Sequence, residues 1–154
     1  MIVPRDDIDR LMAVMEASFD PHFGEAWTRR QVEDAMLMGN CNYFLVDQSG
    51  SAAGQERAAG FYLSRTGVEE EELLLLAVLP ALRGRGLGRI LLEDLIRSAV
   101  SRGARQVFLE MRRGNPAESL YRSFGFKPVG ERSDYYRTTN GDRIDAITFR
   151  IDIA

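Results

Sequence analysis

An apolar strand that runs directly into a glycine- and arginine-rich turn limits this chain's fold more than any other sequence feature. Residues 73–79 read LLLLAVL, and residues 83–89 follow closely as RGRGLGR. From residue 86 onward, apolar residues recur at the spacing of an amphipathic helix, with Gly103 as its stop. Such a strand–turn–helix unit aims backbone N–H groups and a helix N-terminus at one point, which suits a phosphate group. We therefore expect an α/β fold with an anion site at this junction.

Two common phosphate-binding motifs do not fit the turn. A dinucleotide fingerprint, G-x-G-x-x-G, would need a small residue where Arg89 stands. A Walker A loop would need Gly-Lys-Ser/Thr, which is absent. An isolated glycine cluster is more often a flexible turn, but the strand end at Ala77-Val78, the arginines and the immediate helix favour a cofactor site.

The composition is that of a globular protein, and it excludes several functional classes. The 154 residues suit one domain spanning 1–154, with 45% hydrophobic and 28% charged residues. The net charge of −3 argues against a nucleic-acid partner, and no apolar run suggests a membrane span or a signal peptide. One cysteine and one histidine exclude an intrachain disulfide and the usual zinc ligand sets, so we expect no metal and a cytoplasmic location.

Hydrophobic periodicity and turn signals predict the elements in the order ααβββαβαββ. Expected helices cover residues 7–19, 28–38, 86–102 and 116–124. Expected strands cover residues 42–47, 58–65, 71–79, 105–111, 127–132 and 143–153, with an extra strand at 2–4 left open. Thr28 and Gln31 have the spacing of a capping box. The continuous apolar run at 71–79 predicts a strand buried on both faces.

Arg83-x-x-Gly86-x-Gly88 resembles the signature of the GNAT superfamily of acetyl-CoA-dependent N-acyltransferases, and the element order is similar over nearly the whole chain. The resemblance implies a mixed, mostly antiparallel twisted sheet with a central splay, flanked by about four helices. It also implies that acetyl-CoA is the co-substrate. Its thioester end would meet the backbone of Leu76, Ala77 and Val78. Its pyrophosphate would lie on Arg83, Gly84, Arg85, Gly86, Leu87 and Gly88.

Acetyl transfer to an amine needs a base for the amine, a donor for the oxyanion and a proton for the leaving thiolate. Glu110 lies in an apolar strand and is the candidate base; the alternative is a strand-end residue that faces solvent. Tyr121 lies on the short helix and is the candidate acid; the alternative is a core tyrosine packed against Phe124 and Phe126. The two roles of Tyr121 are compatible, because a half-buried phenol can both pack and donate.

Several further residues resemble one GNAT branch, the protein N-terminal acetyltransferases that include the bacterial ribosomal-protein-alanine N-acetyltransferases. Glu110, Asn115 and Tyr121 match its base, its cofactor-contacting asparagine and its acid. The branch pattern is also matched at Trp27-Thr28, Gly125-Phe126, Tyr135-Tyr136, Gly141-Asp142 and Asp145-Ala146. The interval from Asn115 to Tyr121 is one residue shorter than is usual in the family.

The resemblance implies transfer of the acetyl group to a protein N-terminal amine, such as a ribosomal protein that begins with alanine. The peptide would lie between the loop 21–27 and the segment 135–142, against Trp27, Tyr135 and Tyr136. Trp27 could instead anchor the second helix to the core. Acetylation of a small-molecule amine and a non-catalytic acetyl-CoA-binding module are the alternatives, and the oligomeric state stays open.

Overall fold

A computed structural model of the chain describes residues 5–153, so the open question of a strand at 2–4 lies outside the described residues. The α-helices are α1 (Arg5–Ser18), α2 (Arg29–Leu37), α3 (Leu87–Ser101) and α4 (Glu118–Phe124). The strands are β1 (Cys41–Val46), β2 (Gly60–Gly67), β3 (Glu70–Val78), β4 (Gln106–Arg112), β5 (Lys127–Arg137) and β6 (Arg143–Asp152). Two short 3₁₀ turns are η1 (Pro21–Phe23) and η2 (Pro80–Leu82). The predicted order of helices and strands is confirmed.

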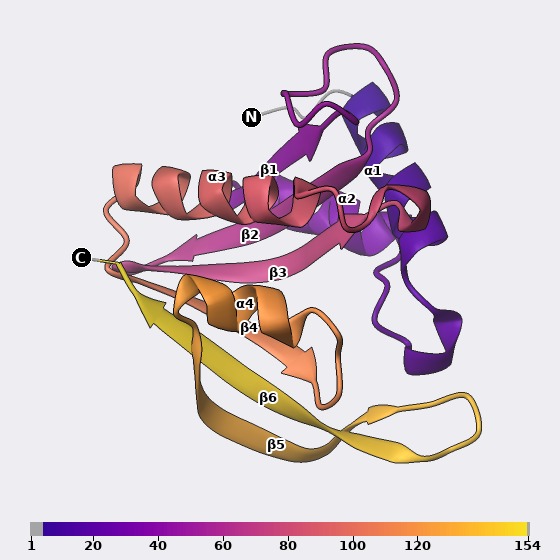
Figure 1. Ribbon diagram of the computed structural model, residues 1–154, viewed down its shortest axis with the longest axis vertical. Coiled ribbons are helices and arrows are strands. Elements are labelled where there is room, and N and C mark those ends of the chain that lie inside the picture. Colours follow the sequence, from indigo (N-terminus) through magenta and orange to yellow (C-terminus); the bar gives the residue numbers. More distant parts are fainter. Residues whose placement is uncertain (1–4, 154) are drawn as a thin grey trace.

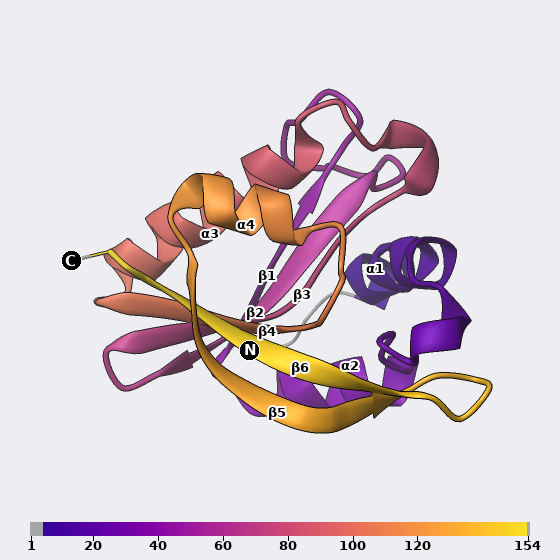
Figure 2. The ribbon, with the colours of Figure 1, turned by 60° about the horizontal axis from the view of Figure 1, so that its bottom comes forward.

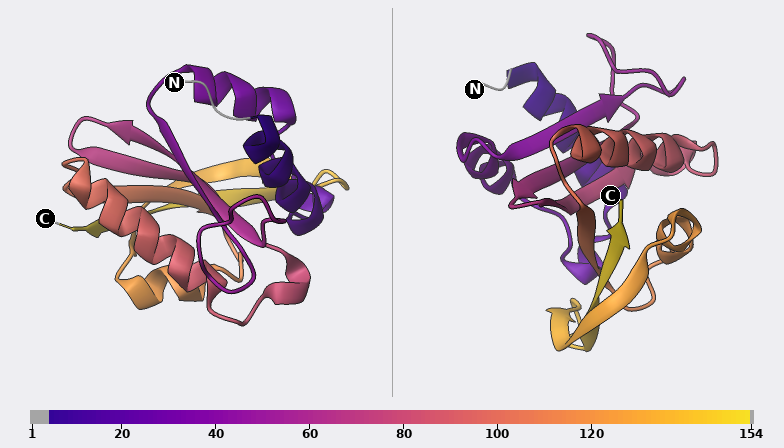
Figure 3. Two further views of the ribbon diagram at one scale, coloured as in Figure 1. Left: turned by 90° about the horizontal axis from the view of Figure 1, so that it is seen from above. Right: turned by 90° about the vertical axis from the view of Figure 1, so that its left-hand side faces the viewer.

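The strands form one mixed sheet in the order β1-β2-β3-β4-β6-β5 (Figure 1). Each neighbouring pair is antiparallel except β3 and β4, which run parallel and are connected through α3. Helices α3 and α4 cover one face of the sheet, and α1 and α2 pack on the other (Figure 3). Two apolar cores therefore sandwich the sheet, and the expected fold class is confirmed.

A bulge in β3 changes which of its residues face each core. In the pairing with β2, Leu63 lies opposite Leu75 but Ser64 lies opposite Leu73, so Leu74 is the extra residue. Leu73 packs in the core beneath α3, whereas Leu75 packs in the core beneath α1 and α2. The expectation of burial on both faces is only partly met. Leu74 and Leu76 are half-buried, whereas Leu73 and Leu75 are buried, and all four line a pocket.

Strands β3 and β4 separate in the middle of the sheet. Their pairing begins at Glu70 and Gln106 and ends at Leu73 and Leu109. Beyond that point β3 stays paired with β2, and β4 stays paired with β6. The facing edges of the two strands are therefore unpaired over their last residues, and each edge carries free backbone N–H and C=O groups. The predicted central splay is confirmed.

The chain enters α2 through the predicted capping box. Thr28 Oγ1 accepts a hydrogen bond from the Gln31 N–H at 3.2 Å, and Gln31 Oε1 accepts one from the Thr28 N–H at 2.7 Å. These reciprocal bonds satisfy two donors of the helix start and fix the direction in which the chain enters it. Trp27, which comes just before Thr28, is thereby held at the end of the loop between α1 and α2.

A buried carboxylate joins the start of β3 to the end of α3. The Glu71 side chain is fully buried and accepts hydrogen bonds from Ser64 Oγ, Thr66 Oγ1, Asn42 Nδ2 and Arg102 Nη2, at 2.5, 2.9, 3.0 and 2.9 Å. Donors from four residues compensate the desolvation of one charge. This network therefore ties the first part of β3, where β3 is still paired with β4, to β1, β2 and the end of α3.

We expect Glu71→Gln to lower the free energy of unfolding by about 2–3 kcal/mol, because the amide loses the ion pair and turns an N–H group toward existing donors. Urea unfolding followed by circular dichroism measures the change. The control is Glu93→Gln, since Glu93 is half exposed and pairs with Arg89 across one turn of α3. Equal midpoints for the two variants would contradict a stabilising role for the Glu71 network.

Candidate active site

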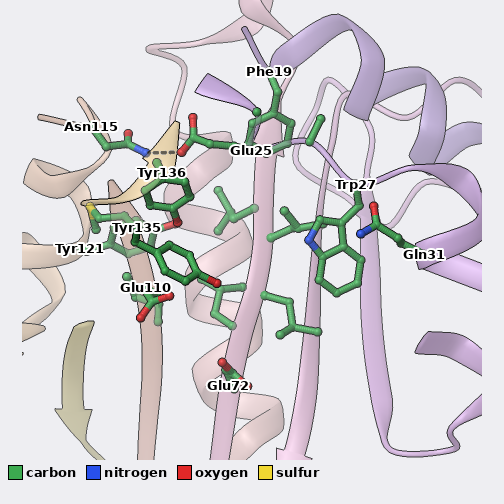
Figure 4. Close-up of a pocket in the computed structure, with 18 residues that line it drawn as sticks. Phe19, Glu25, Trp27, Gln31, Glu72, Glu110, Asn115, Tyr121, Tyr135 and Tyr136 are labelled. Atoms are coloured by element: carbon green, nitrogen blue, oxygen red, sulfur yellow. Dashed lines mark hydrogen bonds between the residues drawn. The ribbon is translucent and has the colours of Figure 1, made fainter. Parts of the chain in front are cut away.

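A pocket of about 490 Å³ lies where β3 and β4 separate (Figure 4). Its lining comes from the α1–α2 loop, the two splayed strands, the start of α4 and the end of β5. It brings together seven residues that the sequence singled out, namely Trp27, Leu76, Glu110, Asn115, Tyr121, Tyr135 and Tyr136. These residues span more than a hundred positions of the chain, so the fold alone makes them neighbours.

The glycine-rich turn follows the end of β3 and leads into α3. Gly84 and Gly86 have φ angles of 79° and 84°, in the left-handed region that favours glycine. Among the described residues 5–153, no acceptor takes a hydrogen bond from the backbone N–H groups of residues 84–89. The first N–H groups of α3 belong to this set and add the positive end of the helix dipole. The turn can therefore bind an anionic phosphate, as the sequence predicted.

Arg83 uses its side chain inside the protein. Its Nε donates to the Val78 carbonyl at 3.2 Å, and its Nη2 donates to the Ser18 carbonyl at 2.8 Å. These bonds hold the turn against the end of β3 and the end of α1. A direct bond from this guanidinium to a phosphate stays a prediction, and the turn's own backbone is the better placed donor.

The unpaired edge of β3 and the phosphate-binding turn are consecutive in the chain. Leu76, Ala77 and Val78 lie on the strand segment that faces the splay, and the turn begins five residues later. An elongated ligand with a phosphate at one end fits this arrangement, because amide groups along its arm can pair with a free strand edge. The residues present therefore fit coenzyme A.

Glu110 lies on β4 within the pocket lining. Its side chain is 21% exposed, and its Oε2 lies 3.3 Å from Thr148 Oγ1 and 3.2 Å from Arg132 Nε. The hydroxyl of Thr148, on β6, donates to this oxygen. The carboxylate is thus held in place but still reaches the pocket, so it does not have the open surroundings of a strand-end surface residue.

Tyr121 lies on α4 and is 7% exposed. Its ring packs edge-on against Phe126, with ring centroids 5.7 Å apart. Burial, followed by the charge of Glu25, raises the pKa of the phenol, so the hydroxyl stays protonated at neutral pH. The packing against Phe126 that the sequence allowed is present, and Tyr121 also lines the pocket; its role as the acid stays a prediction.

Asn115 is engaged with protein groups at both ends of its amide. Its Oδ1 accepts from the Ala117 N–H at 2.9 Å at the start of α4, and its Nδ2 donates to Glu25 Oε2 at 3.5 Å. The bond to Ala117 closes a turn just before α4, whose N-cap is Ala117. Its predicted contact with the cofactor stays a prediction.

Two aromatic groups form opposite walls of the pocket. Trp27 lines one wall and also packs partly against the core beneath α1 and α2, as the anchoring interpretation expects; its contact with a peptide stays a prediction. Tyr135 and Tyr136 form the other, with ring centroids 5.1 Å apart. Burial, with the charges of Glu25 and Glu110, raises the pKa of Tyr136 to about 12. The sequence placed this pair between two strands, but both residues lie within β5, which is longer than expected.

Sequence reasoning missed Glu25. This residue lies in the α1–α2 loop and lines the pocket, where its carboxylate accepts from Arg112 Nε at 3.2 Å. The two residues are 87 positions apart, so no local pattern could have paired them. The only local signal is a charged residue in a loop that is otherwise rich in large apolar side chains.

The described residues contain no cluster of histidine, cysteine and carboxylate groups that could hold a metal ion. No helix in the described part of the chain is long and apolar enough to cross a membrane.

Comparisons with known proteins agree with this geometry. The family model described as "Acetyltransferase (GNAT) family" matches residues 8–126. The chain is 36% identical over 88 residues to the [ribosomal protein bS18]-alanine N-acetyltransferase of Haemophilus influenzae, covering 57% of the chain and 60% of that relative. It is 39% identical over 99 residues to the Escherichia coli K12 protein of the same name, covering 64% of the chain and 66% of that relative. These alignments thus leave about a third or more of each relative unmatched.

A solved structure extends the likeness to the whole chain. The crystal structure of the ribosomal-protein-S18-alanine N-acetyltransferase from Escherichia coli superposes with a TM-score of 0.82 at 27% identity. The superposition covers 100% of this chain and 92% of that one.

Proposed function

The chain belongs to the GNAT family of acetyl-CoA-dependent acetyltransferases, and from this premise we propose that it acetylates the N-terminal α-amine of a protein. The observation that carries the proposal is the pocket at the splay, where Glu110, Tyr121 and the tyrosine pair of β5 meet. The names of the similar proteins support a ribosomal protein with an N-terminal alanine as the acceptor.

Acetyl-CoA supplies the acetyl thioester in this proposal. The backbone of Leu76, Ala77 and Val78 would hold its arm beside the splay, since their strand edge is unpaired there. The N–H groups of residues 84–88 would bind its pyrophosphate, with Arg83 shaping the turn from behind.

Glu110 and Tyr121 would move the two protons. The Glu110 carboxylate would take a proton from the acceptor ammonium, directly or through a water, because only the neutral amine can attack a carbonyl carbon. The Tyr121 hydroxyl would give its proton to the departing sulfur. Figure 4 places the two side chains on the same side of the pocket, which suits consecutive steps at one centre.

Trp27, Tyr135 and Tyr136 would hold the acceptor peptide. They come from the α1–α2 loop and the β5–β6 hairpin, which lie side by side at this end of the molecule (Figure 2). Rigid rings with N–H and O–H groups can pack on an extended chain and bond its backbone at a low cost in entropy. If the acceptor were a small-molecule amine, these three aromatic side chains would have no extended chain to contact.

Peptide acetylation can be tested directly with labelled acetyl-CoA. We expect label on an alanine-starting peptide, on its N-terminal amine by mass spectrometry, and none on the same peptide with a blocked N-terminus and an internal lysine. Transfer to free amino acids or polyamines but not to the peptide would favour the small-amine alternative. Thermal stabilisation by acetyl-CoA with no transfer to any amine would favour a non-catalytic binding module.

The phosphate-binding turn yields a separate prediction. Gly86→Val should weaken acetyl-CoA binding by about tenfold or more, because a β-branched residue resists a positive φ and would distort the turn. Isothermal titration calorimetry with acetyl-CoA measures the change. Gly39→Val is the matched control. Gly39 has a φ of 81°, and a Cβ added there would meet no atom within 4 Å, as at Gly86. It lies beyond the end of α2, outside the phosphate-binding turn. Equal losses of affinity in both variants would point to general destabilisation.

A further inference from the structure

The α1–α2 loop is tied to the corner between β4 and α4. Glu25 Oε1 accepts from Arg112 Nε at 3.2 Å, and both side chains are 14% exposed. The Arg112 guanidinium also lies over the ring of Phe23, 3.6 Å from its centroid. A charge pair that is this protected from water is held more firmly than a surface pair.

The same carboxylate reaches the helix that carries the candidate acid. Glu25 Oε2 accepts from Asn115 Nδ2 at 3.5 Å, and the other end of the Asn115 amide accepts from the N–H of Ala117, the N-cap residue of α4. Tyr121 lies one turn further along α4. A continuous set of contacts therefore runs from the loop to the helix of Tyr121.

A second tie joins the loop to the β5–β6 hairpin. The Thr139 N–H donates to the His22 carbonyl at 3.0 Å, and His22 Nδ1 lies 2.7 Å from Thr139 Oγ1. Thr139 is three residues beyond Tyr136. The loop that ends at Trp27 is therefore fixed both to the segment between β4 and α4 and to the hairpin that carries Tyr135 and Tyr136.

We infer that Glu25 is a positioning residue that acts through Arg112 and holds the Trp27 wall at a fixed spacing from Tyr121. This inference rests on the proposed function, since it assigns the wall to the acceptor peptide. A direct role as a second base is disfavoured, because each carboxylate oxygen of Glu25 already accepts a bond from a protein donor. Glu25 would then affect acceptor binding by fixing the position of the loop, and not by contacting the charge of the acceptor itself.

The kinetic test uses Glu25→Gln, Arg112→Gln and the double variant in the full chain. We expect the KM for the alanine-starting peptide to rise about tenfold in each single variant, with the KM for acetyl-CoA unchanged. Because the two residues act as a unit, the double variant should lie within about twofold of either single variant. If a substitution only reduced the amount of folded protein, the apparent kcat would fall and the peptide KM would stay unchanged.

A second readout needs no substrate. Trp27 is the only tryptophan of the chain and lies two residues from Glu25, so its fluorescence reports on the loop. Both single variants should make Trp27 more accessible to acrylamide, at unchanged far-ultraviolet circular dichroism. Glu93→Gln is the control, because that exposed carboxylate lies on α3, outside the pocket lining.

Two results would overturn the inference. One is a double variant whose peptide KM rises by the product of the two single effects. That result would mean that Glu25 and Arg112 act independently. The other is wild-type quenching of Trp27 in both single variants, which would mean that the loop is not held by this pair. If the wild-type chain acetylates no peptide, the proposed function fails but the quenching result still decides whether the pair holds the loop.

Discussion

Glu110→Gln is expected to lower kcat for peptide acetylation by about 10²- to 10⁴-fold at neutral pH, the usual contribution of a general base. The amide keeps the shape of the carboxylate and can still accept from Thr148, so the pocket should stay intact. It cannot take a proton from the acceptor ammonium. The KM for acetyl-CoA should stay the same, because Glu110 lies on β4 and not on the strand edge or turn proposed to bind it. Steady-state kinetics with the alanine-starting peptide measures both parameters.

Glu131→Gln is the control for this variant. Glu131 lies on β5 in the same sheet, but it is about half exposed and pairs with Arg113 away from the pocket lining. It should keep wild-type kcat, which shows that loss of a negative charge from the sheet is not enough. Wild-type kcat in a folded Glu110→Gln variant would remove Glu110 from the mechanism.

The strand–turn–helix unit at residues 70–101 could be predicted from the sequence because its signals are local. The apolar run of β3, the glycines at positive φ and the apolar stripe of α3 each depend on residues within a few positions. The splay and the candidate roles of Glu110 and Tyr121 came from the resemblance to a family, because hydrophobic periodicity predicts neither.

The shape of the pocket depends on contacts between distant residues, and these could not be predicted from the sequence. The bulge at Leu74 exists only in the pairing with β2, and it decides in which core Leu73 and Leu75 pack. The strand character of this end of β5 comes from pairing with β6, as of Tyr136 with Ile144, since this part of β5 has no buried alternation. The contact of Glu25 with Arg112 joins two segments that no local signal links.

Tyr121→Phe is the second variant for which we expect a large loss of kcat, again between about 10²- and 10⁴-fold, because the proton donor for the departing sulfur is removed. The ring should keep its contact with Phe126, and the described chain offers the Tyr121 hydroxyl no hydrogen-bond partner that would be lost. The midpoint of thermal unfolding at neutral pH should therefore match the wild type. Phe124→Leu, on the same short helix, is the control for altered packing.

The pH dependence separates the two variants. An α-amine has a pKa near 8, so at about pH 9 most of the acceptor is already neutral and needs no base. The deficit of Glu110→Gln should therefore shrink between about pH 7 and pH 9, whereas the deficit of Tyr121→Phe should persist, because burial raises the pKa of that phenol and keeps it protonated throughout. A deficit in Tyr121→Phe that disappears at high pH would assign the tyrosine to amine deprotonation instead.

The raised pKa of Tyr121 also has a consequence for stability. A group whose pKa is higher in the folded state stabilises the fold below its unfolded pKa, which is about 10 for tyrosine, and loses that contribution as the pH rises above it. Wild-type stability should therefore fall more steeply above about pH 10 than that of Tyr121→Phe, which has no phenol to ionise. Urea unfolding at neutral pH and above about pH 10 measures the difference. Parallel losses in the two proteins would show that the phenol ionises as freely in the folded chain as in the unfolded one, and would contradict a raised pKa for Tyr121.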